Sequence, residues 1–277
     1  MFKIRKYKSG DEKQILKLDR LVEEHPWNRR NIQNWYWKFK NAPYKSPSVY
    51  VCEYKKKLIG TFSTIPIRYY INGKEVCLSN SIAMIVHPKF QDKGIIKFIG
   101  DKLLNETKKK SDLVFGYPNT RSYELHKTFF DYEDVFDQKL YELNNLKNFK
   151  FKQAKQVLKI EKIKKFSSIF NTLARKNKNK FYAQTVRDAK FLNWRYVSRP
   201  DNKYYNFQIN DLSSKKVIGF FVCKLYRYQK KLFGHIIDYY IVSKEIKKYN
   251  ESILQAINFL KNKKVKYIST DKIVFDM

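Results

Sequence analysis

The sequence predicts a mixed α/β fold of the α+β kind, arranged as two similar domains in one chain of 277 residues. Strand-like runs of branched and aromatic residues alternate with segments of helical spacing. The stretch Ser79–Gly116 has the order strand, glycine turn, helix, strand, which is the crossover connection that parallel strands need. A similar order of features appears twice, and the chain is long enough for two modest domains.

The elements of the first half follow from local patterns. Alternating residues predict strands, Ser9-Gly10-Asp11-Glu12 can cap a helix with an apolar face, and Asn72-Gly73 is a hairpin signal. Pro43 stops the second helix, and Pro88 ends the strand before it. The predicted strands are Phe2–Lys8, Ser48–Tyr54, Leu58–Tyr70, Glu75–Val86, Asp112–Gly116 and Tyr132–Leu143, and the main helices are Asn31–Lys40, Ile95–Lys108 and Arg121–Phe129.

Two segments share a tryptophan, a proline, an aromatic strand, a lysine-rich turn and an aliphatic-Ile-Gly triplet, in that order. They are Asn31–Gly60 and Ala189–Gly219, and each is followed by two strands around a polar hairpin. This shared order favours a degenerate tandem repeat over a chance likeness of strand-rich segments. The polar, basic stretch Asn144–Gln156 separates the copies, so we predict domains over residues 1–145 and 155–277. The landmarks are Trp37, Pro43 and Leu58-Ile59-Gly60, then Trp194, Pro200 and Val217-Ile218-Gly219.

Composition indicates an ordered protein, because 43% of the residues are hydrophobic and 17% are aromatic. No apolar run reaches the roughly 18 residues that a membrane span needs, and the first ten residues show no signal-peptide pattern. The three cysteines are scattered and odd in number, which predicts reduced thiols and a cytoplasmic protein, without a disulfide framework or a metal site. They are Cys52, Cys77 and Cys223.

The chain is strongly basic, with 58 lysines and arginines against 26 aspartates and glutamates and a formal net charge of +32. Such an excess is typical of a protein with a polyanionic partner, such as nucleic acid, anionic lipid or a phosphate-rich cofactor. Lys, Asn, Ile, Tyr and Phe are all abundant, however, and all have A/T-rich codons, while the lysines are spread along the chain. We therefore attribute most of the charge to genome composition, with local use at an anion site.

The junction after the strand Ser79–Val86 predicts that anion site. His87-Pro88 ends the strand, and Gln91-Asp92-Lys93-Gly94 opens a helix with apolar residues at helical spacing. A tight glycine turn at a helix start gathers free backbone N–H groups and the positive end of the helix dipole, which suits a phosphate. The second copy has neither glycine nor proline at the matching junction after Val242. We therefore expect one active site, in the first half.

These residues resemble the GCN5-related N-acetyltransferase (GNAT) superfamily, in a tandem arrangement with a degenerate second half. Residues Gln91–Ile96 are similar to its Arg/Gln-x-x-Gly-x-Gly/Ala motif, with Ile96 in place of the final small residue, and Val86-His87-Pro88 before them is typical of the family. The segment from Asn119 resembles Asn-x-x-Ala-x-x-Leu-Tyr-x-Lys-x-Gly-Phe, with Ser122 for Ala, His126 for Tyr and Phe130 for Gly. The likeness covers the first half, while the second half resembles the fold without the motif.

The resemblance implies two GNAT-like domains, each a twisted, mixed, mostly antiparallel sheet flanked by helices. Acetyl-CoA, as co-substrate and without a metal, is expected where the strands Ser79–Val86 and Asp112–Gly116 splay apart. Unpaired strand N–H groups are expected to hold the pantetheine and acyl carbonyl, and the turn the pyrophosphate, with charge added by Lys89 and Lys97. The expected cofactor-binding residues are Met84, Ile85, Val86, Gln91, Asp92, Lys93, Gly94, Ile95, Ile96, Asn119 and Ser122.

His126 is the candidate proton donor to the departing thiolate, because histidine titrates near neutral pH, and Tyr123 is the alternative acid. Asn80 and Ser81 lie on the key strand but are not bases. Glu23, Glu24 and His25 lie in the loop that usually borders the acceptor, although a solvated turn is the favoured interpretation, and a water relay is equally open. His235 and Asp238 fit either an acceptor pocket or a satisfied polar pair.

The resulting hypothesis is an N-acyltransferase that moves an acetyl group from acetyl-CoA to a primary amine of a small molecule, such as an amino sugar or amino acid derivative, by direct attack in a ternary complex. One alternative is a Fem-like aminoacyl transferase that uses charged tRNA. Another is a non-catalytic polyanion-binding protein. Nucleic acid is the less favoured partner. We expect a monomer or homodimer in which the second domain is acceptor-side or structural.

Overall fold

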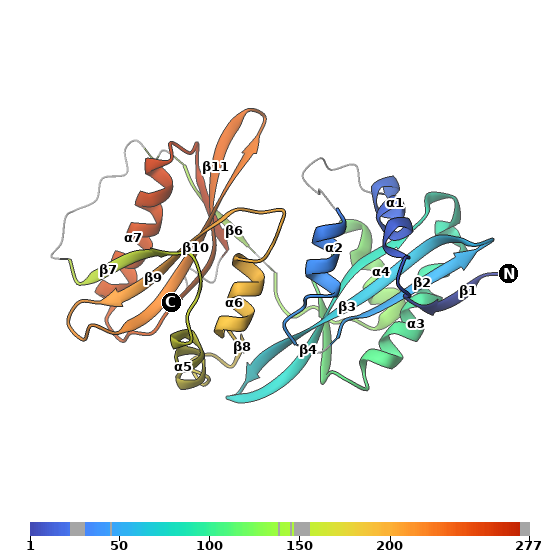
Figure 1. Cartoon of the computed structure of the whole chain (residues 1–277), viewed down its shortest axis with the longest axis horizontal. Helices are drawn as coiled ribbons and strands as arrows, with labels where there is room; N and C mark the ends of the chain where they lie inside the picture. The colour runs from blue at the N-terminus through green and yellow to red at the C-terminus, as the bar shows by residue number, and fades with distance from the viewer. Residues whose placement is uncertain (23–30, 45, 138, 145, 147–155, 272–277) are drawn as a thin grey trace. The chain divides into compact units, whose positions relative to one another are not determined.

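The computed structural model describes residues 1–22, 31–44, 46–137, 139–144, 146 and 156–271, and it divides into two compact units (Figure 1). Unit 1 comprises Met1–Val135 together with Lys178–Val186. Unit 2 comprises Phe136–Asn177 and Arg187–Met277. Each unit contains a six-stranded sheet with helices packed on it, so the predicted mixed α/β fold with two similar halves is confirmed.

The sheet of unit 1 has the strand order β1-β2-β3-β4-β5, and β8 pairs with β3. Neighbouring strands are antiparallel except β4 and β5, which are parallel, as the crossover pattern predicts. The bounds are β1 Lys3–Lys6, β2 Ser48–Tyr54, β3 Lys57–Ile71, β4 Lys74–Val86, β5 Leu113–Gly116 and β8 Ala183–Thr185. The helices are α1 Glu12–Val22, α2 Ile32–Phe39, α3 Ile95–Thr107 and α4 Thr120–Phe130, and a 3₁₀ helix, η1, covers Pro88–Lys93.

Each face of this sheet has its own core, because alternate residues of a strand point to opposite faces. Val49 and Val51 of β2 pack with residues of α1 and α2, including Trp35. Tyr50 and Cys52 alternate with these valines along β2, and they pack with α3 and α4 on the other face. The helices α1 and α2 therefore cover one face of unit 1, which we call the α1/α2 face, and α3 and α4 cover the opposite face (Figure 1).

Unit 2 repeats this plan with the strand order β6-β12-β11-β10-β9-β7. Its parallel pair is β11 with β12, and the other neighbouring pairs are antiparallel. The core joins the sheet to α7 through residues such as Phe207, Phe221 and Leu260. The bounds are β6 Leu140–Leu143, β7 Leu158–Ile163, β9 Tyr204–Asp211, β10 Val217–Tyr228, β11 Lys231–Ile241, β12 Ile268–Asp271, α5 Ile169–Lys176, α6 Ala189–Tyr196 and α7 Ile246–Asn262.

The two units exchange chain segments relative to the predicted organisation. The strand expected over Tyr132–Leu143 in the first domain is the shorter β6, which pairs with β12 in unit 2. In return β8, from the second half of the sequence, adds to β3 in unit 1. The boundary between the two compact units thus lies between Val135 and Phe136. The sequence had placed the domain boundary later, in the polar segment 144–156. Both strands are short, so they carry little sequence signal of their own.

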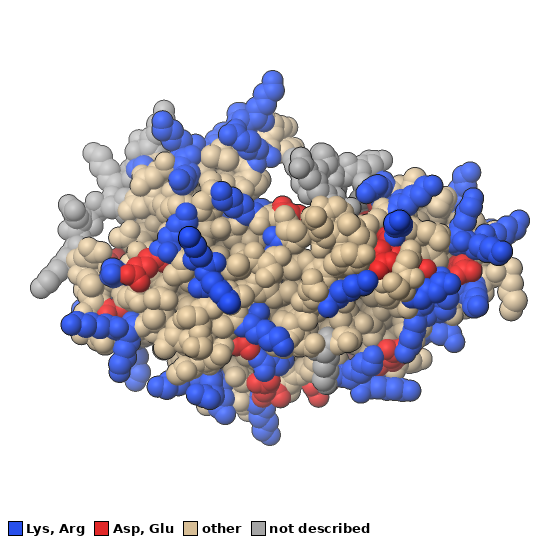
Figure 2. Space-filling view, in the orientation of Figure 1, with Lys and Arg blue, Asp and Glu red and all other residues tan. Residues whose placement is uncertain are grey.

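Basic side chains are scattered over the visible face and alternate with uncharged surface and acidic groups (Figure 2). This distribution agrees with our interpretation that most of the charge reflects composition. In the described part of the chain, no helix is long and apolar enough to cross a membrane. No group of three or more potential metal ligands occurs among the same residues.

Glu12, at the start of α1, makes stability depend on pH. Its carboxylate is 3% exposed and accepts hydrogen bonds from the Tyr7 hydroxyl and, at 2.6 Å, from Gly10 N–H, while Lys40 Nζ lies 3.1 Å away. Burial alone would raise the pKa of Glu12, but these hydrogen bonds outweigh it and lower the pKa to about 2. Since the folded pKa lies below the unfolded one, the stabilisation is present above about pH 5 and is lost as the pH falls toward 2.

We expect Glu12→Gln to lower the free energy of unfolding at pH 7 by about 3 kcal/mol, from the size of the pKa shift. We also expect it to flatten the decrease of that free energy between about pH 5 and pH 2. Urea denaturation at several pH values measures both. Glu75→Gln, at a half-exposed carboxylate paired with Arg68, is the control, and an equal change in the two variants would contradict the prediction.

Candidate active site

An open strand edge lies where β4 and β5 part. The two strands pair from Leu78 opposite Leu113 to Ser81 opposite Gly116. Beyond Gly116 the chain turns toward α4, whereas β4 continues to Val86, so residues 82–86 of β4 have no strand partner on this side among the described residues. His87 N–H donates to Ile59 O of β3. Because N–H groups alternate along a strand, the N–H of Val86 faces the open edge.

A β-bulge interrupts β4 at the beginning of this edge. Thr61 pairs with Ile85 and Ser63 with Ile82, so one extra residue of β4 stands opposite Phe62. Ala83 takes a left-handed backbone conformation there, with φ of 53°. A bulge re-aims the backbone groups and side chains around it. The peptide groups of Ala83 and Met84 are thereby turned out of the regular ladder at the point where β5 has left the sheet.

The predicted glycine turn follows β4 directly. His87 Nδ1 accepts a hydrogen bond from Lys89 N–H and caps η1, and the Gln91 side chain donates back to Val86 O. Gly94 then takes the left-handed conformation, φ 66°, and starts α3 without a side-chain cap. The first N–H groups of a helix lack intrahelical partners. The start of α3 therefore presents free donors and a positive helix end beside the open edge of β4.

The apolar motif residues are turned into the core. Ile95 and Ile96 are 1% and 6% exposed and pack with Phe62 and Ile99 on the α3/α4 face. Ile85 and Val86 are also buried, and Met84 is partly buried. Val86, Ile95 and Ile96 can therefore contact a ligand only through their backbone. Ile96, the departure from the small residue of the motif, places its side chain in the core of unit 1.

Asn119 and Ser122 form the cap of α4. Asn119 Oδ1 accepts from Ser122 N–H at 2.9 Å, and Asn119 N–H donates to Ser122 Oγ at 3.1 Å, which is a reciprocal capping box. Asn119 is thus the N-cap of α4. The cap fixes the start of α4 just after the chain leaves β5, and so fixes the side chains that follow on that helix.

His126 is buried beside the end of the paired region of β4. Its side chain is 5% exposed, and its Nδ1 lies 2.7 Å from Ser122 O. A carbonyl can only accept, so Nδ1 carries the hydrogen, and Nε2 faces Ser81 Oγ at 3.5 Å. The imidazole makes edge-on contacts with three aromatic rings, those of Phe62, Phe130 and Tyr132.

Tyr123, the alternative acid, has a different environment. Its hydroxyl donates to Asp134 Oδ2 at 2.7 Å and accepts from Lys127 Nζ at 3.3 Å. Lys127 also pairs with Asp134 at 2.8 Å, and both of these charged side chains are exposed. The phenol proton of Tyr123 is therefore engaged in a surface ion network, whereas His126 Nε2 faces the key strand.

The remaining candidate site residues lie either outside the described part of the chain or in unit 2. Glu23, Glu24 and His25 lie outside the described residues. His235 Nδ1 lies 2.7 Å from Ser269 Oγ, and burial lowers the pKa of His235. Asp238 accepts hydrogen bonds from Arg187 Nε at 3.1 Å and from the Tyr196 hydroxyl at 2.9 Å. Both residues thus have polar partners within unit 2. This agrees with the structural interpretation of His235 and Asp238 rather than with a role in an acceptor pocket.

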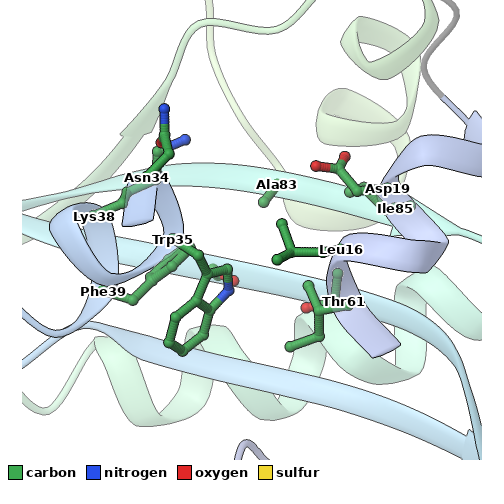
Figure 3. Close-up of a pocket in the computed structure, with 11 residues that line it drawn as sticks. Leu16, Asp19, Asn34, Trp35, Lys38, Phe39, Thr61, Ala83 and Ile85 are labelled. Atoms are coloured by element: carbon green, nitrogen blue, oxygen red, sulfur yellow. The ribbon is translucent and has the colours of Figure 1, made fainter. Parts of the chain in front are cut away.

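A pocket on the α1/α2 face reaches the bulge of β4 (Figure 3). The pocket and the solvent-open space at its mouth together have a volume of about 420 Å³. Sequence reasoning missed it, although one signal was present: Asp19 follows Ile15 by four residues and therefore lies on the apolar stripe of α1. The lining residues are Ile15, Leu16, Asp19, Asn34, Trp35, Lys38, Phe39, Thr61, Ser63, Ala83 and Ile85.

The open edge, the glycine turn and the crossover between β4 and β5 are the features that the resemblance to the GNAT superfamily led us to expect. Residues 3–132 match the family described as Acetyltransferase (GNAT) domain. The expected resemblance to the GNAT superfamily is thus confirmed over these residues. A search of curated proteins found no match.

Solved structures with the same fold span both units. The chain is 14% identical to a probable N-acyltransferase of unknown function from Enterococcus faecalis V583, with a TM-score of 0.73 over 98% of this chain and 65% of that one. It is 16% identical to a GCN5-related N-acetyltransferase from Anabaena variabilis ATCC 29413, with a TM-score of 0.71 over 98% and 66%. It thus spans slightly less than two thirds of both chains. A tandem GNAT protein from the clavulanic acid biosynthesis pathway is 9% identical, with a TM-score of 0.66 over 100% and 91%.

Proposed function

We propose that this enzyme is an N-acetyltransferase that transfers the acetyl group of acetyl-CoA to a primary amine of a small molecule in the cytoplasm. The observation that carries the proposal is the open edge of β4, which leads directly into the uncapped start of α3 at Gly94. The edge suits an extended chain with amide groups, and the helix start suits a pyrophosphate. Pantetheine and pyrophosphate are adjacent in coenzyme A, as these two features are in the fold.

The donor would be held mainly by backbone groups. The Val86 N–H faces the opening, and the bulge turns the peptide group of Met84 out of the ladder there, whereas the Ile85 N–H faces β3 by the same alternation. The N–H groups of residues 91–96 lie at the turn. Lys89, Lys93 and Lys97 add positive charge near the turn, and Asn119 and Ser122 lie at the start of α4 beyond β5. Backbone recognition explains why the apolar side chains of this motif can be buried without loss of the binding site.

The reaction forms one bond and breaks another. The amine nitrogen attacks the thioester carbonyl carbon, the C–N bond forms, and the C–S bond breaks. The amine loses one proton, and the coenzyme A thiolate gains one. An N–H group turned out by the bulge can meet the oxyanion that develops on the carbonyl oxygen. Positioning of two bound reactants can contribute roughly 7–11 kcal/mol to such a reaction.

His126 is the proposed proton donor to the thiolate. In the neutral ring the hydrogen sits on Nδ1, toward Ser122 O, so Nε2 can donate only when the ring is protonated. Ser81 Oγ, 3.5 Å from Nε2, lies at the last paired position before the open edge and can relay the proton. Tyr123 remains the second candidate, although its proton is already donated to Asp134.

We expect His126→Gln to lower kcat by about 100-fold, the lower end of the usual contribution of general acid catalysis, with the dissociation constant of acetyl-CoA unchanged. Tyr123→Phe is the matched variant and should retain kcat within about threefold. The reverse pattern would assign the acid to Tyr123.

Calorimetric titration of the wild-type protein with acetyl-CoA tests the proposal. We expect a dissociation constant in the micromolar range, which corresponds to about −8 kcal/mol, and release of coenzyme A thiol when amines are added. Bulk tRNA is titrated in parallel at two salt concentrations. Salt-sensitive tRNA binding without acetyl-CoA binding would overturn the proposal in favour of a tRNA-dependent transferase or a polyanion-binding protein.

A further inference from the structure

We propose that unit 2 carries a binding site for a small oxyanion, the carboxylate or phosphate group of a ligand, built around the side chains of Lys224 and Arg195. The inference goes beyond the proposed acetyl transfer, because both residues belong to unit 2 whereas the proposed donor turn belongs to unit 1. Lys224 lies on β10, and Arg195 lies near the end of α6. We call the two cations and their polar neighbours the Lys224 cluster, which comprises Arg195, Arg199, Tyr204, Lys224 and His235.

Strand pairing places the polar side chains of this cluster side by side on one face of the sheet. Lys224 pairs with Tyr204 of β9 and with His235 of β11. Residues that pair directly in an antiparallel sheet point to the same face and are close neighbours. Cys223, the residue before Lys224, packs into the core under α7. The Lys224 cluster therefore lies on the opposite face of the sheet of unit 2.

Lys224 is a half-buried cation without a counter-charge. Its ammonium group has no hydrogen bond or ion pair within the described part of the chain. Burial lowers the pKa of Lys224, the nearby charges of Arg199 and Arg195 also lower it, and Asp201 acts in the opposite direction. Charged groups that are withdrawn from water are usually paired, because an unpaired charge there is costly. A bound oxyanion would supply the missing partner of Lys224.

Arg195 is a second cation of the same kind. It is half-buried, its guanidinium group lies 5.8 Å from the centre of the Tyr196 ring, and it has no hydrogen bond or ion pair among the residues that the structure describes. The Tyr196 ring in turn contacts the ring of Tyr204 at 5.3 Å, which brings the end of α6 against β9. A guanidinium fork binds two oxygens of a carboxylate or phosphate, and an ammonium group adds a compact charge. Arg195 and Lys224 thus offer complementary donors to one oxyanion.

The neighbouring groups leave this positive charge in place. Asp201 accepts hydrogen bonds from Arg199 at 2.7 and 3.1 Å, so its carboxylate is already paired. Arg199 also donates to the Tyr204 hydroxyl at 3.3 Å, which leaves the phenol hydrogen of Tyr204 available to a ligand. Burial lowers the pKa of His235, and Lys224 lowers it further while Asp271 opposes them, so the imidazole is neutral at pH 7.

Unit 1 provides an internal comparison. Lys224 follows Gly219, the glycine of the repeat, by five residues, and Ile65 follows Gly60 by the same number. Ile65 pairs with Asn80 of β4 and is 4% exposed. The repeated fold thus accepts an apolar side chain at this position of the sheet, and the lysine is a property of unit 2 alone. This comparison favours a role in binding over a role in folding for Lys224.

Calorimetric titration with inorganic phosphate and with acetate, at constant ionic strength, tests the inference. The host protein is Gly94→Glu, because inorganic phosphate would also bind at the proposed donor turn of unit 1. We expect a dissociation constant of about 1 mM for at least one of the two probes, and the tighter probe assigns the chemical group. Lys224→Met and Arg195→Gln should each weaken binding about tenfold, as loss of a charged hydrogen-bond donor does. Lys231→Met, at an exposed lysine of the same hairpin, is the matched control and should bind as the host does.

Thermal denaturation provides a second measurement. Without an oxyanion, Lys224→Met should have the Tm of the host protein or a higher one, because an unpaired charge has been removed. The tighter probe should raise the Tm of the host but not that of Lys224→Met. A lower Tm of Lys224→Met in the absence of the probe would reveal a partner within the chain and overturn the inference. Binding of neither probe, or equal weakening in Lys231→Met, would overturn it as well. Failure of the wild-type protein to bind acetyl-CoA would refute the proposed function and leave this site untouched.

Discussion

Replacing Gly94 with glutamate is expected to weaken acetyl-CoA binding by at least about 100-fold, or roughly 2.7 kcal/mol. Gly94 has φ of 66°, which costs an L-residue about 1 kcal/mol. A Cβ at this position would meet only the Phe98 ring, at 3.7 Å, so the new side chain has room to extend from the turn. Its carboxylate would then compete with the pyrophosphate for the free N–H groups at the start of α3 and repel it.

Gly94→Asn separates charge from backbone strain, because asparagine tolerates the left-handed conformation and is neutral. We expect this variant to bind acetyl-CoA within about tenfold of the wild type, since only part of the strain remains. Calorimetry of both variants at one salt concentration gives the two dissociation constants, and thermal denaturation confirms that both fold. Equal affinities in Gly94→Glu and the wild type would show that the phosphates do not lie at this turn.

The donor side of the site could be predicted from the sequence because its signals are local. Val86-His87-Pro88 ends a strand, and Gly94 starts a helix, and each is a property of a few adjacent residues. The structure adds a feature that depends on the pairing of two strands and not on a local pattern. The bulge at Ala83 depends on the register between β3 and β4, and the residue types of β4 do not predict it.

The tandem repeat was also predictable, and the structure explains one of its landmarks. In the first copy Cys52 pairs with Gly60 and Glu53 with Leu58, which leaves Ile59 as a bulge. In the second copy Ile209 pairs with Gly219 and Asn210 with Val217, which leaves Ile218 in the same place. The aliphatic-Ile-Gly triplet therefore marks a conserved geometry within this chain, a bulge followed by a glycine, at the same point of both sheets.

The exchange of β6 and β8 between the units could not be predicted. Each strand has only three or four residues, and its partner lies far away in the sequence. Pairing of such strands depends on residues far apart in the sequence, which no short-range pattern records. The pocket on the α1/α2 face was missed for a similar reason, because α1, α2 and β4 converge only in the folded unit.

The bulge in the second copy leads to the other large expected effect, a loss of stability in Gly219→Ala. A Cβ on Gly219 would lie 2.2 Å from Tyr240 O and 2.8 Å from Ile241 Cα, both atoms of the backbone of β11. Backbone in the centre of a sheet cannot move aside without loss of ladder hydrogen bonds. We expect the free energy of unfolding to fall by about 3 kcal/mol, the upper end of the usual cost of overpacking.

Gly60→Ala is the matched variant in unit 1. Its Cβ would lie 2.8 Å from Ile99 Cδ1 and 3.3 Å from Ile95 Cγ2, and these are ends of side chains that can rotate away. We expect a cost of only about 1 kcal/mol. Hydrogen exchange should show faster exchange of β9, β10 and β11 in Gly219→Ala, with β2 and β3 unchanged. Equal destabilisation by both substitutions would contradict the argument, since the two glycines then would not differ in what surrounds them. Because the proposed donor turn lies in unit 1, Gly219→Ala should also retain acetyl-CoA binding under conditions in which it is folded.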